Sequence, residues 1–240
     1  MKKLLLFLVL LLAAGPAQAG DGPLVLASGA GYKKMVNALV EVYGTETGNP
    51  VELVYGNMAQ VAAQVRTGGK VDLVLGADFF LGDPALNLTA QHELGRGRLV
   101  LAWPKGQAEK TTASLTAPET SRIALPNTKQ AIYGKAALEY LQRTGVYAQV
   151  EPKLVEVATV PQVYAYLAAN EVDLGFLNLT QAMNVRETLG GYLVLDDKDY
   201  DPIRIVVCEV GDGPHPKAKA DFLRFLESGK AKKILRANGL

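Results

Sequence analysis

Leu24-Val25-Leu26-Ala27-Ser28-Gly29-Ala30-Gly31 is an apolar run that passes directly into a turn of small and polar residues. Such a run predicts a buried strand with a tight turn at its end. From about Tyr32, apolar residues then recur at helical spacing until Gly44 and Gly48. Because this unit of strand, small turn and helix returns along the chain, the sequence predicts an α/β fold with parallel strands.

The same periodicity places further elements along the remaining sequence. Strands are predicted at residues 51–55, 71–76, 99–103, 123–125, 154–157, 173–177, 192–195 and 203–207. Helices are predicted at residues 59–66, 132–143, 160–170, 181–187 and 217–237, the last one broken at Gly229. Residues 79–96 show no clear period and are predicted to form a looser connection.

These elements fall into two α/β units. The break at Trp103-Pro104 is the expected first crossing between them, and the late strand at 203–207 is the expected return. The sequence therefore predicts a discontinuous lobe I, residues 20–102 and 206–240, and a lobe II of residues 103–205.

The first nineteen residues have the layout of a secretory signal peptide. Lys2 and Lys3 precede the apolar run Leu4 to Ala14, and Ala17-Gln18-Ala19 supplies small residues at the cleavage site. The apolar run is short for a membrane span, and no cysteine follows it as a lipid attachment point. We therefore expect a free periplasmic protein.

Composition limits the classes of partner. The chain has 25 Lys and Arg residues against 24 Asp and Glu, and loss of Lys2 and Lys3 with the leader leaves a formal charge of −1. This balance argues against a nucleic-acid partner. Cys208 is the single cysteine, and the two histidines, His92 and His215, have no metal-ligand spacing. No cofactor and no metal-cation site is expected.

Four of the predicted strand-to-helix junctions are built from small or polar residues. They are Ser28 to Gly31, Gly56 to Ala59, Asn127 to Ala131, and Thr159-Val160. Because a helix begins with unpaired N–H groups and a partial positive charge, such junctions favour anions. Two lie in each lobe, so junctions facing one another would grip a small oxyanion from both sides. The alternative is that Ser28 and Thr159 only cap helices and the glycines only turn the chain.

Several blocks of the sequence match one known family. They are Leu26-Ala27-Ser28, Ala62-Ala63-Gln64-Val65 with Gly68-Gly69 and Val71 to Asp78, Leu99 to Lys105, Ile132 to Leu138, and Val172 to Phe176. On these blocks the chain resembles the periplasmic molybdate-binding proteins of ABC importers across nearly its whole length. The resemblance implies a two-lobed periplasmic binding protein of type II, hinged by two crossing strands. It further implies a monomer that closes on molybdate or tungstate through neutral donors and delivers it to a membrane permease.

The resemblance also implies a set of ligand-binding positions. Ser28 matches the first ligand serine of the family, and Met58, beside Asn57, stands where the second serine is expected. The remaining matched positions are Gln130 or Ala131 and Val160 as backbone donors, and Asn178 at the family's ligand tyrosine. Two hydroxyl groups are thus replaced. Because amides both donate and accept, Asn57 and Asn178 leave room for a protonated oxyanion or another small polar ligand.

An enzyme is the less favoured class. The chain has no Gly-x-Ser-x-Gly motif and no glycine-rich nucleotide loop, and Cys208 lies in an apolar strand. The sequence therefore predicts transport of an oxyanion without turnover. Sulfate, phosphate or another polar solute remains an alternative ligand, and a sensor subunit remains an alternative role.

Overall fold

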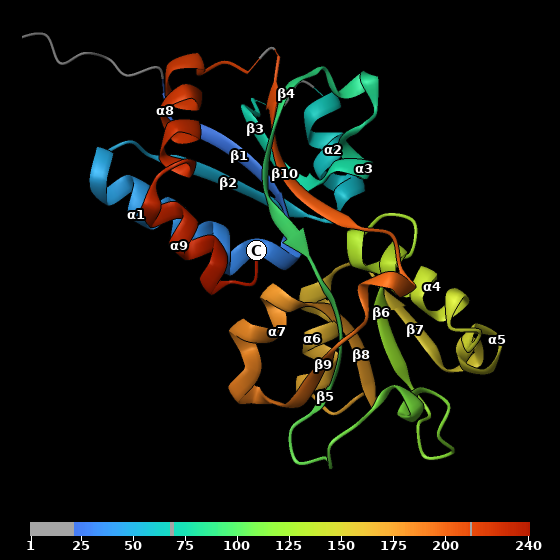
Figure 1. The fold of residues 1–240 in the computed structure, drawn as a ribbon. Coiled ribbons are helices and arrows are strands. Elements are labelled where there is room, and N and C mark those ends of the chain that lie inside the picture. The colour runs from blue at the N-terminus through green and yellow to red at the C-terminus, as the bar shows by residue number, and fades with distance from the viewer. Residues whose placement is uncertain (1–21, 68–69, 212) are drawn as a thin grey trace, which may run out of the picture.

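Two α/β lobes stacked one above the other make up the structure, a computed structural model that describes residues 22–67, 70–211 and 213–240 (Figure 1). Each lobe contains one five-stranded sheet with helices packed against it. The predicted signal peptide and Gly68-Gly69 lie outside the described residues. The expected two-lobed α/β fold is confirmed.

The first sheet has the strand order β2-β1-β3-β10-β4. Its strands are β1 (Leu24–Gly29), β2 (Val51–Gly56), β3 (Leu73–Ala77), β4 (Leu88–Gly97) and β10 (Ile203–Val210). β1 pairs in parallel with β2 and β3, whereas β10 pairs antiparallel with β3 and β4. The helices of this lobe are η1 (Ala30–Tyr32), α1 (Lys33–Thr47), α2 (Met58–Arg66), α3 (Asp78–Leu81), η2 (Pro84–Leu86), α8 (Pro216–Leu226) and α9 (Gly229–Ala237).

The second sheet has the order β7-β6-β8-β5-β9. Its strands are β5 (Leu99–Pro104), β6 (Ile123–Pro126), β7 (Leu154–Val157), β8 (Leu174–Asn178) and β9 (Leu189–Val194). The helices of this lobe are η3 (Thr112–Leu115), α4 (Ile132–Arg143), α5 (Tyr147–Val150), η4 (Glu151–Lys153), α6 (Val160–Ala168), α7 (Leu179–Val185), η5 (Arg186–Thr188) and η6 (Asp197–Asp199).

The two sheets repeat one plan. In each, three parallel strands are followed by one strand that is antiparallel to both of its neighbours and then by an edge strand, so that β1, β2 and β3 correspond in position to β6, β7 and β8. The carboxyl ends of parallel strands lie at one edge of a sheet, which is where α/β proteins place their binding residues. In both lobes this edge faces the other lobe, because helix starts from both lobes line one shared cavity.

The chain passes from the first sheet to the second at a single residue. β4 ends at Gly97 in the first sheet and β5 begins at Leu99 in the second, so only Arg98 separates the sheets. The return lies between β9 and Ile203, where β10 begins. The exact limits of the lobes remain a prediction, and sheet membership favours limits near Arg98 and Pro202 over the expected 102/103 and 205/206.

The predicted and observed positions of this connection differ because of β4, which lies where the sequence predicts a loose connection. Most of its side chains are exposed or half-buried, because it is an edge strand of the first sheet with polar residues along it. It therefore lacks the apolar alternation that predicts a strand. Because the apolar pattern does not reveal β4, the predicted lobe I extends to residue 102 and takes in most of the strand at 99–103. The structure places this strand, β5, in the sheet of lobe II.

A buried carboxylate links β1 and β3 to the segment before α8 in lobe I. Asp72 stands just before β3 and is 0% exposed. One of its oxygens accepts the Val25 N–H (2.8 Å) and contacts Nδ1 of His215 (2.9 Å), and the other accepts the His215 N–H (2.8 Å). Asp72 thus joins the start of β1 to the segment that leads into α8, as expected of a structural acceptor.

Asp173 occupies the same place before β8 in lobe II. One of its oxygens accepts the N–H groups of Ser121 (2.8 Å) and Arg122 (3.0 Å) at the start of β6. Partial burial alone would raise the pKa of this carboxyl, but these N–H donors outweigh burial and lower it. Both lobes therefore use a carboxylate to align neighbouring parallel strands.

The Asp72→Ala substitution should lower the free energy of unfolding by about 2–5 kcal/mol, because the N–H groups of Val25 and His215 lose their acceptor away from water. Asp173→Ala is the matched control, and its smaller expected loss reflects donors that can reach water. Urea denaturation followed by circular dichroism measures both. Equal losses for the two variants would contradict the structural role of burial at Asp72.

Candidate functional site

A small cavity, partly open to solvent, lies between the two lobes. Four segments line it, and each is the junction of a strand with the helix that follows. The lining residues are Gly29, Ala30, Gly31, Tyr32, Gly56, Asn57, Met58, Ala131, Ile132, Tyr133, Thr159 and Val160. The four polar junctions identified in the sequence therefore do converge on one cavity.

The chemistry of this cavity is that of neutral donors. None of the described residues lining it carries a charged side chain. The starts of η1, α2, α4 and α6 all lie there, and the first N–H groups of a helix have no carbonyl partner within that helix. Together they supply partial positive charge without a lysine or arginine.

One of the four helix starts is already occupied by the other lobe. The Gln130 carbonyl accepts the Met58 N–H (2.9 Å) and the Ala59 N–H (3.4 Å) at the beginning of α2. The N–H of Gln130 donates to Oδ1 of Asn127 (2.8 Å), and the N–H of Ala131 donates to the Asn127 carbonyl (3.0 Å). Neither expected donor of this loop is free, so the open N–H groups at α4 are those of Ile132 and Tyr133.

Val160 is placed as the sequence predicts. It is the first residue of α6, is 5% exposed and lines the cavity. The preceding Thr159 donates its own N–H to Oε1 of Gln162 (3.2 Å), which fixes the start of this helix. Among the described residues the Val160 N–H has no hydrogen-bond acceptor, so it is available at the cavity.

Ser28 and Asn178 lie behind the lining. Both are 0% exposed and neither lines the cavity. The Ser28 hydroxyl lies 3.3 Å from the carbonyl oxygen of the adjoining Gly29, to which it donates. Asn178 begins α7, and its amide donates to the Gly31 carbonyl (3.2 Å), so it joins the lobes. A ligand contact by either side chain stays a prediction.

The amide oxygens of both asparagines are engaged in helix caps. Oδ1 of Asn57 accepts the Gln60 N–H (3.0 Å) at α2, and Oδ1 of Asn178 accepts the Gln181 N–H (3.3 Å) at α7. The NH₂ groups are engaged as well, since that of Asn57 donates to Oε1 of Gln130 (3.4 Å) and that of Asn178 to the Gly31 carbonyl. Both side chains are therefore held in place by structural hydrogen bonds, and a role for either amide toward a ligand stays a prediction.

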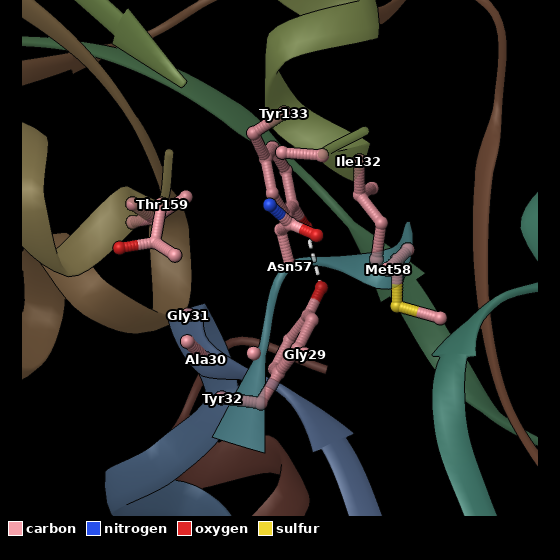
Figure 2. Close-up of a pocket in the computed structure, with 12 residues that line it drawn as sticks. Gly29, Ala30, Gly31, Tyr32, Asn57, Met58, Ile132, Tyr133 and Thr159 are labelled. Carbon is pink, nitrogen blue, oxygen red and sulfur yellow. Dashed lines mark hydrogen bonds between the residues drawn. The ribbon is translucent and has the colours of Figure 1, made fainter. Parts of the chain in front are cut away.

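A pair of tyrosine hydroxyl groups bridges the lobes at the cavity. Figure 2 shows Tyr32 and Tyr133 reaching toward one another from opposite sides, and their oxygens lie 2.5 Å apart. Burial raises the pKa of both hydroxyls, most of all that of Tyr133 beside Tyr32. Both therefore stay protonated at neutral pH, and one donates to the other.

Gly97 provides the space for this pair. A Cβ atom at Gly97 would lie 2.1 Å from the Tyr133 hydroxyl oxygen and 3.0 Å from that of Tyr32. Since Gly97 is the last residue of β4, the tyrosine pair sits directly against the point where the chain crosses between lobes. The lining of the cavity thus reaches the segment that connects the two sheets.

Part of the site escapes prediction from the sequence for identifiable reasons. Tyr32 and Tyr133 fit the apolar periodicity of their helices, a pattern that favours core packing over a place at a binding cavity. Gly97 lies in the strand that has no strand pattern. Glu156, which accepts three hydrogen bonds from Asn127 and Thr128, resembles any exposed strand residue. Only its position opposite the Asn127 loop gives it a role.

Neither a cluster of metal ligands nor a membrane-spanning helix occurs in the part of the chain that the structure describes. Across residues 22–67, 70–211 and 213–240, no three His, Cys, Asp or Glu side chains are grouped to hold a metal ion. Over the same ranges, no helix has the length and hydropathy needed to cross a membrane.

Two similar lobes that enclose a neutral, donor-lined cavity define a protein that binds a small solute between its lobes. The chain belongs to the bacterial extracellular solute-binding protein family, whose model matches residues 24–240. The resemblance to molybdate-binding proteins seen in the sequence is confirmed by its relatives.

Two molybdate-binding proteins illustrate the similarity. The chain is 28% identical over 230 residues to the molybdate-binding protein ModA of Rhodobacter capsulatus, covering 93% of this chain and 89% of that protein. It is 26% identical over 247 residues to ModA of Azotobacter vinelandii, covering 97% and 96%. The solved periplasmic molybdate-binding protein of Azotobacter vinelandii shares the fold, with a TM-score of 0.82 and 22% identity over 90% of this chain and 97% of that one.

The buried tyrosine pair predicts a stability loss at alkaline pH. Because the folded pKa of each hydroxyl is raised, the contribution is complete below the unfolded tyrosine pKa of about 10 and is lost as pH rises above it. In Tyr133→Phe the free energy of unfolding, measured by urea titration, should fall less between about pH 9 and about pH 11 than in the unaltered protein. Tyr166→Phe, at a half-buried tyrosine outside the cavity, is the control. If the free energy of unfolding of Tyr133→Phe falls as much over this pH range as that of the unaltered protein, the tyrosine pair is not the source of the alkaline loss.

Proposed function

We propose that the protein captures a small tetrahedral oxyanion, with molybdate or tungstate as the first choice, in the cavity between its lobes. In this proposal it acts as a periplasmic monomer that delivers the anion to the permease of an ABC importer without chemical turnover. The observation that supports this proposal most strongly is that helices from both lobes begin at one cavity, whose described lining has no charged side chain. The molybdate-binding relatives support the choice of anion.

Neutral donors suit an anion that must be released again. N–H groups at helix starts stabilise negative charge through fixed dipoles, and they bring no full counter-charge that would itself have to be desolvated. In this site the N–H groups of Ala30 and Gly31 from lobe I and of Ile132, Tyr133 and Val160 from lobe II fill that role. Donors from both lobes favour the closed arrangement when the anion is bound.

The cavity favours an oxyanion without a bound proton. No carboxylate, the strongest side-chain acceptor for a ligand proton, is among its described lining residues. A protonated ligand such as hydrogen phosphate needs an acceptor for its own hydrogen. Molybdate, tungstate and sulfate present only acceptors at neutral pH, so the donor set matches them better than phosphate.

Isothermal titration calorimetry with molybdate, tungstate, sulfate and phosphate tests the proposal. We expect one anion per chain, with molybdate or tungstate bound most tightly and phosphate most weakly. Thermal shift with the same four anions provides an independent readout, because a ligand of the folded state raises Tm. Absence of heat and of thermal shift with all four would end the oxyanion proposal.

A substitution at Val160 tests the backbone donor directly. Val160→Pro removes the N–H at the first position of α6, where proline is tolerated and Thr159 is already extended. Affinity for the preferred anion should fall by about 1–3 kcal/mol, the scale of a lost hydrogen bond to a charged group. Val160→Ala keeps the N–H and is the matched control. The same affinity in both variants would exclude this donor.

A further inference from the structure

The loop of residues 127–130, here called the closing loop, connects β6 of lobe II with the start of α4. It is the segment of lobe II that touches the start of α2 in lobe I. Its Gln130 carbonyl accepts the Met58 N–H at 2.9 Å and the Ala59 N–H at 3.4 Å. The Asn57 amide donates to the Gln130 side-chain oxygen (3.4 Å). A single residue of one lobe thus pairs with three consecutive residues of the other.

The shape of the closing loop is set from within lobe II. Oδ1 of Asn127 accepts the N–H groups of Lys129 (3.1 Å) and Gln130 (2.8 Å), which turns the Gln130 carbonyl outward. Gly134 lets α4 pack directly on this turn, since a Cβ there would lie 2.1 Å from the Asn127 carbonyl oxygen.

Glu156 of β7 holds the same loop from outside. Its carboxylate accepts Nδ2 of Asn127 (2.6 Å), the Thr128 N–H (3.1 Å) and the Thr128 hydroxyl (2.8 Å). Hydrogen bonds to an ionised carboxylate are stronger than those between neutral groups. An exposed residue that does not line the cavity therefore fixes the loop that makes the contact.

We propose that the closing loop, positioned by Glu156, holds the lobes together through the Gln130 carbonyl on α2, and that this contact persists when an anion is bound. The start of α2 is then used for closure, and the anion is gripped by the starts of η1, α4 and α6. Gln130 and Glu156 are positioning residues, since they set the donor geometry without touching the anion. The effect on anion affinity rests on the proposed function, whereas the effect on closure does not.

Glu156→Gln tests the positioning role. A glutamine offers one acceptor oxygen in place of two and brings an NH₂ group toward existing donors, so the loop should loosen. Glu171→Gln, at an exposed lobe II position, is the matched control. Anion affinity should weaken about three- to tenfold in Glu156→Gln, the range of one net hydrogen bond, and stay unchanged in the control.

Met58→Pro tests the interlobe bond itself. Proline is tolerated at the first position of α2, and Asn57 is extended (φ −70°, ψ 168°), as a residue before proline must be. Because Met58 is buried, Met58→Ala is made in parallel: it loses the side chain but keeps the N–H. The ratio of the two affinities isolates the bond to Gln130, and we expect Met58→Pro to bind about three- to tenfold more weakly than Met58→Ala.

Closure is measured without anion by electron paramagnetic resonance distances between nitroxides on Gln64→Cys in α2 and Gln142→Cys in α4, both exposed sites. Native Cys208 is buried. The fraction of molecules with the longer distance between the two nitroxides should rise in Glu156→Gln, and in Met58→Pro relative to Met58→Ala.

Unchanged nitroxide distances in both comparisons would overturn the proposal. Tighter anion binding in either variant would also overturn it, because the carbonyl would then compete with the ligand. If the unaltered chain binds none of the four anions, the proposed function fails, and the distances still test closure.

Discussion

The arrangement of parallel strands in each lobe is the constraint on which the rest of the molecule depends. β1 and β2 in one lobe, and β6 and β7 in the other, end at the edge that faces the opposite lobe. Every helix that follows one of these strands must therefore begin beside the cavity. Four helix starts in one place create a positive potential with no cationic side chain among the described lining residues. The buried carboxylate of Asp72 and its counterpart Asp173 keep these strands aligned.

The contacts across the cavity are short and involve both backbone and side-chain groups. The Gln130 carbonyl on α2, the hydroxyl pair of Tyr32 and Tyr133, and the Asn178 amide on the Gly31 carbonyl all cross between lobes. The turn that follows α9 also reaches α7 (Figure 1), where the Thr180 hydroxyl donates to the Asn238 carbonyl at 2.8 Å. Modest contacts of this kind let a bound solute shift the balance between open and closed lobes.

Neutrality of the cavity has a physical consequence for selection. A lysine or arginine would attract every anion, whereas fixed N–H dipoles reward only an anion whose oxygens match their positions. The two asparagines next to the cavity, Asn57 and Asn178, are tied into helix caps through their oxygens. They therefore add rigidity to the donor frame.

The sequence by itself determined the α/β class, the strand-to-helix junctions and the neutral character of the site, because apolar periodicity and small polar turns are local properties. Only the tertiary structure decided which N–H groups stay open: those of Gln130 and Ala131 are consumed within their own loop, and that of Met58 by the other lobe. The polar edge strand β4, after which the chain passes into the second sheet, was likewise invisible locally. Hydrogen-bond partners and edge positions depend on residues distant in the chain, and no local pattern records them.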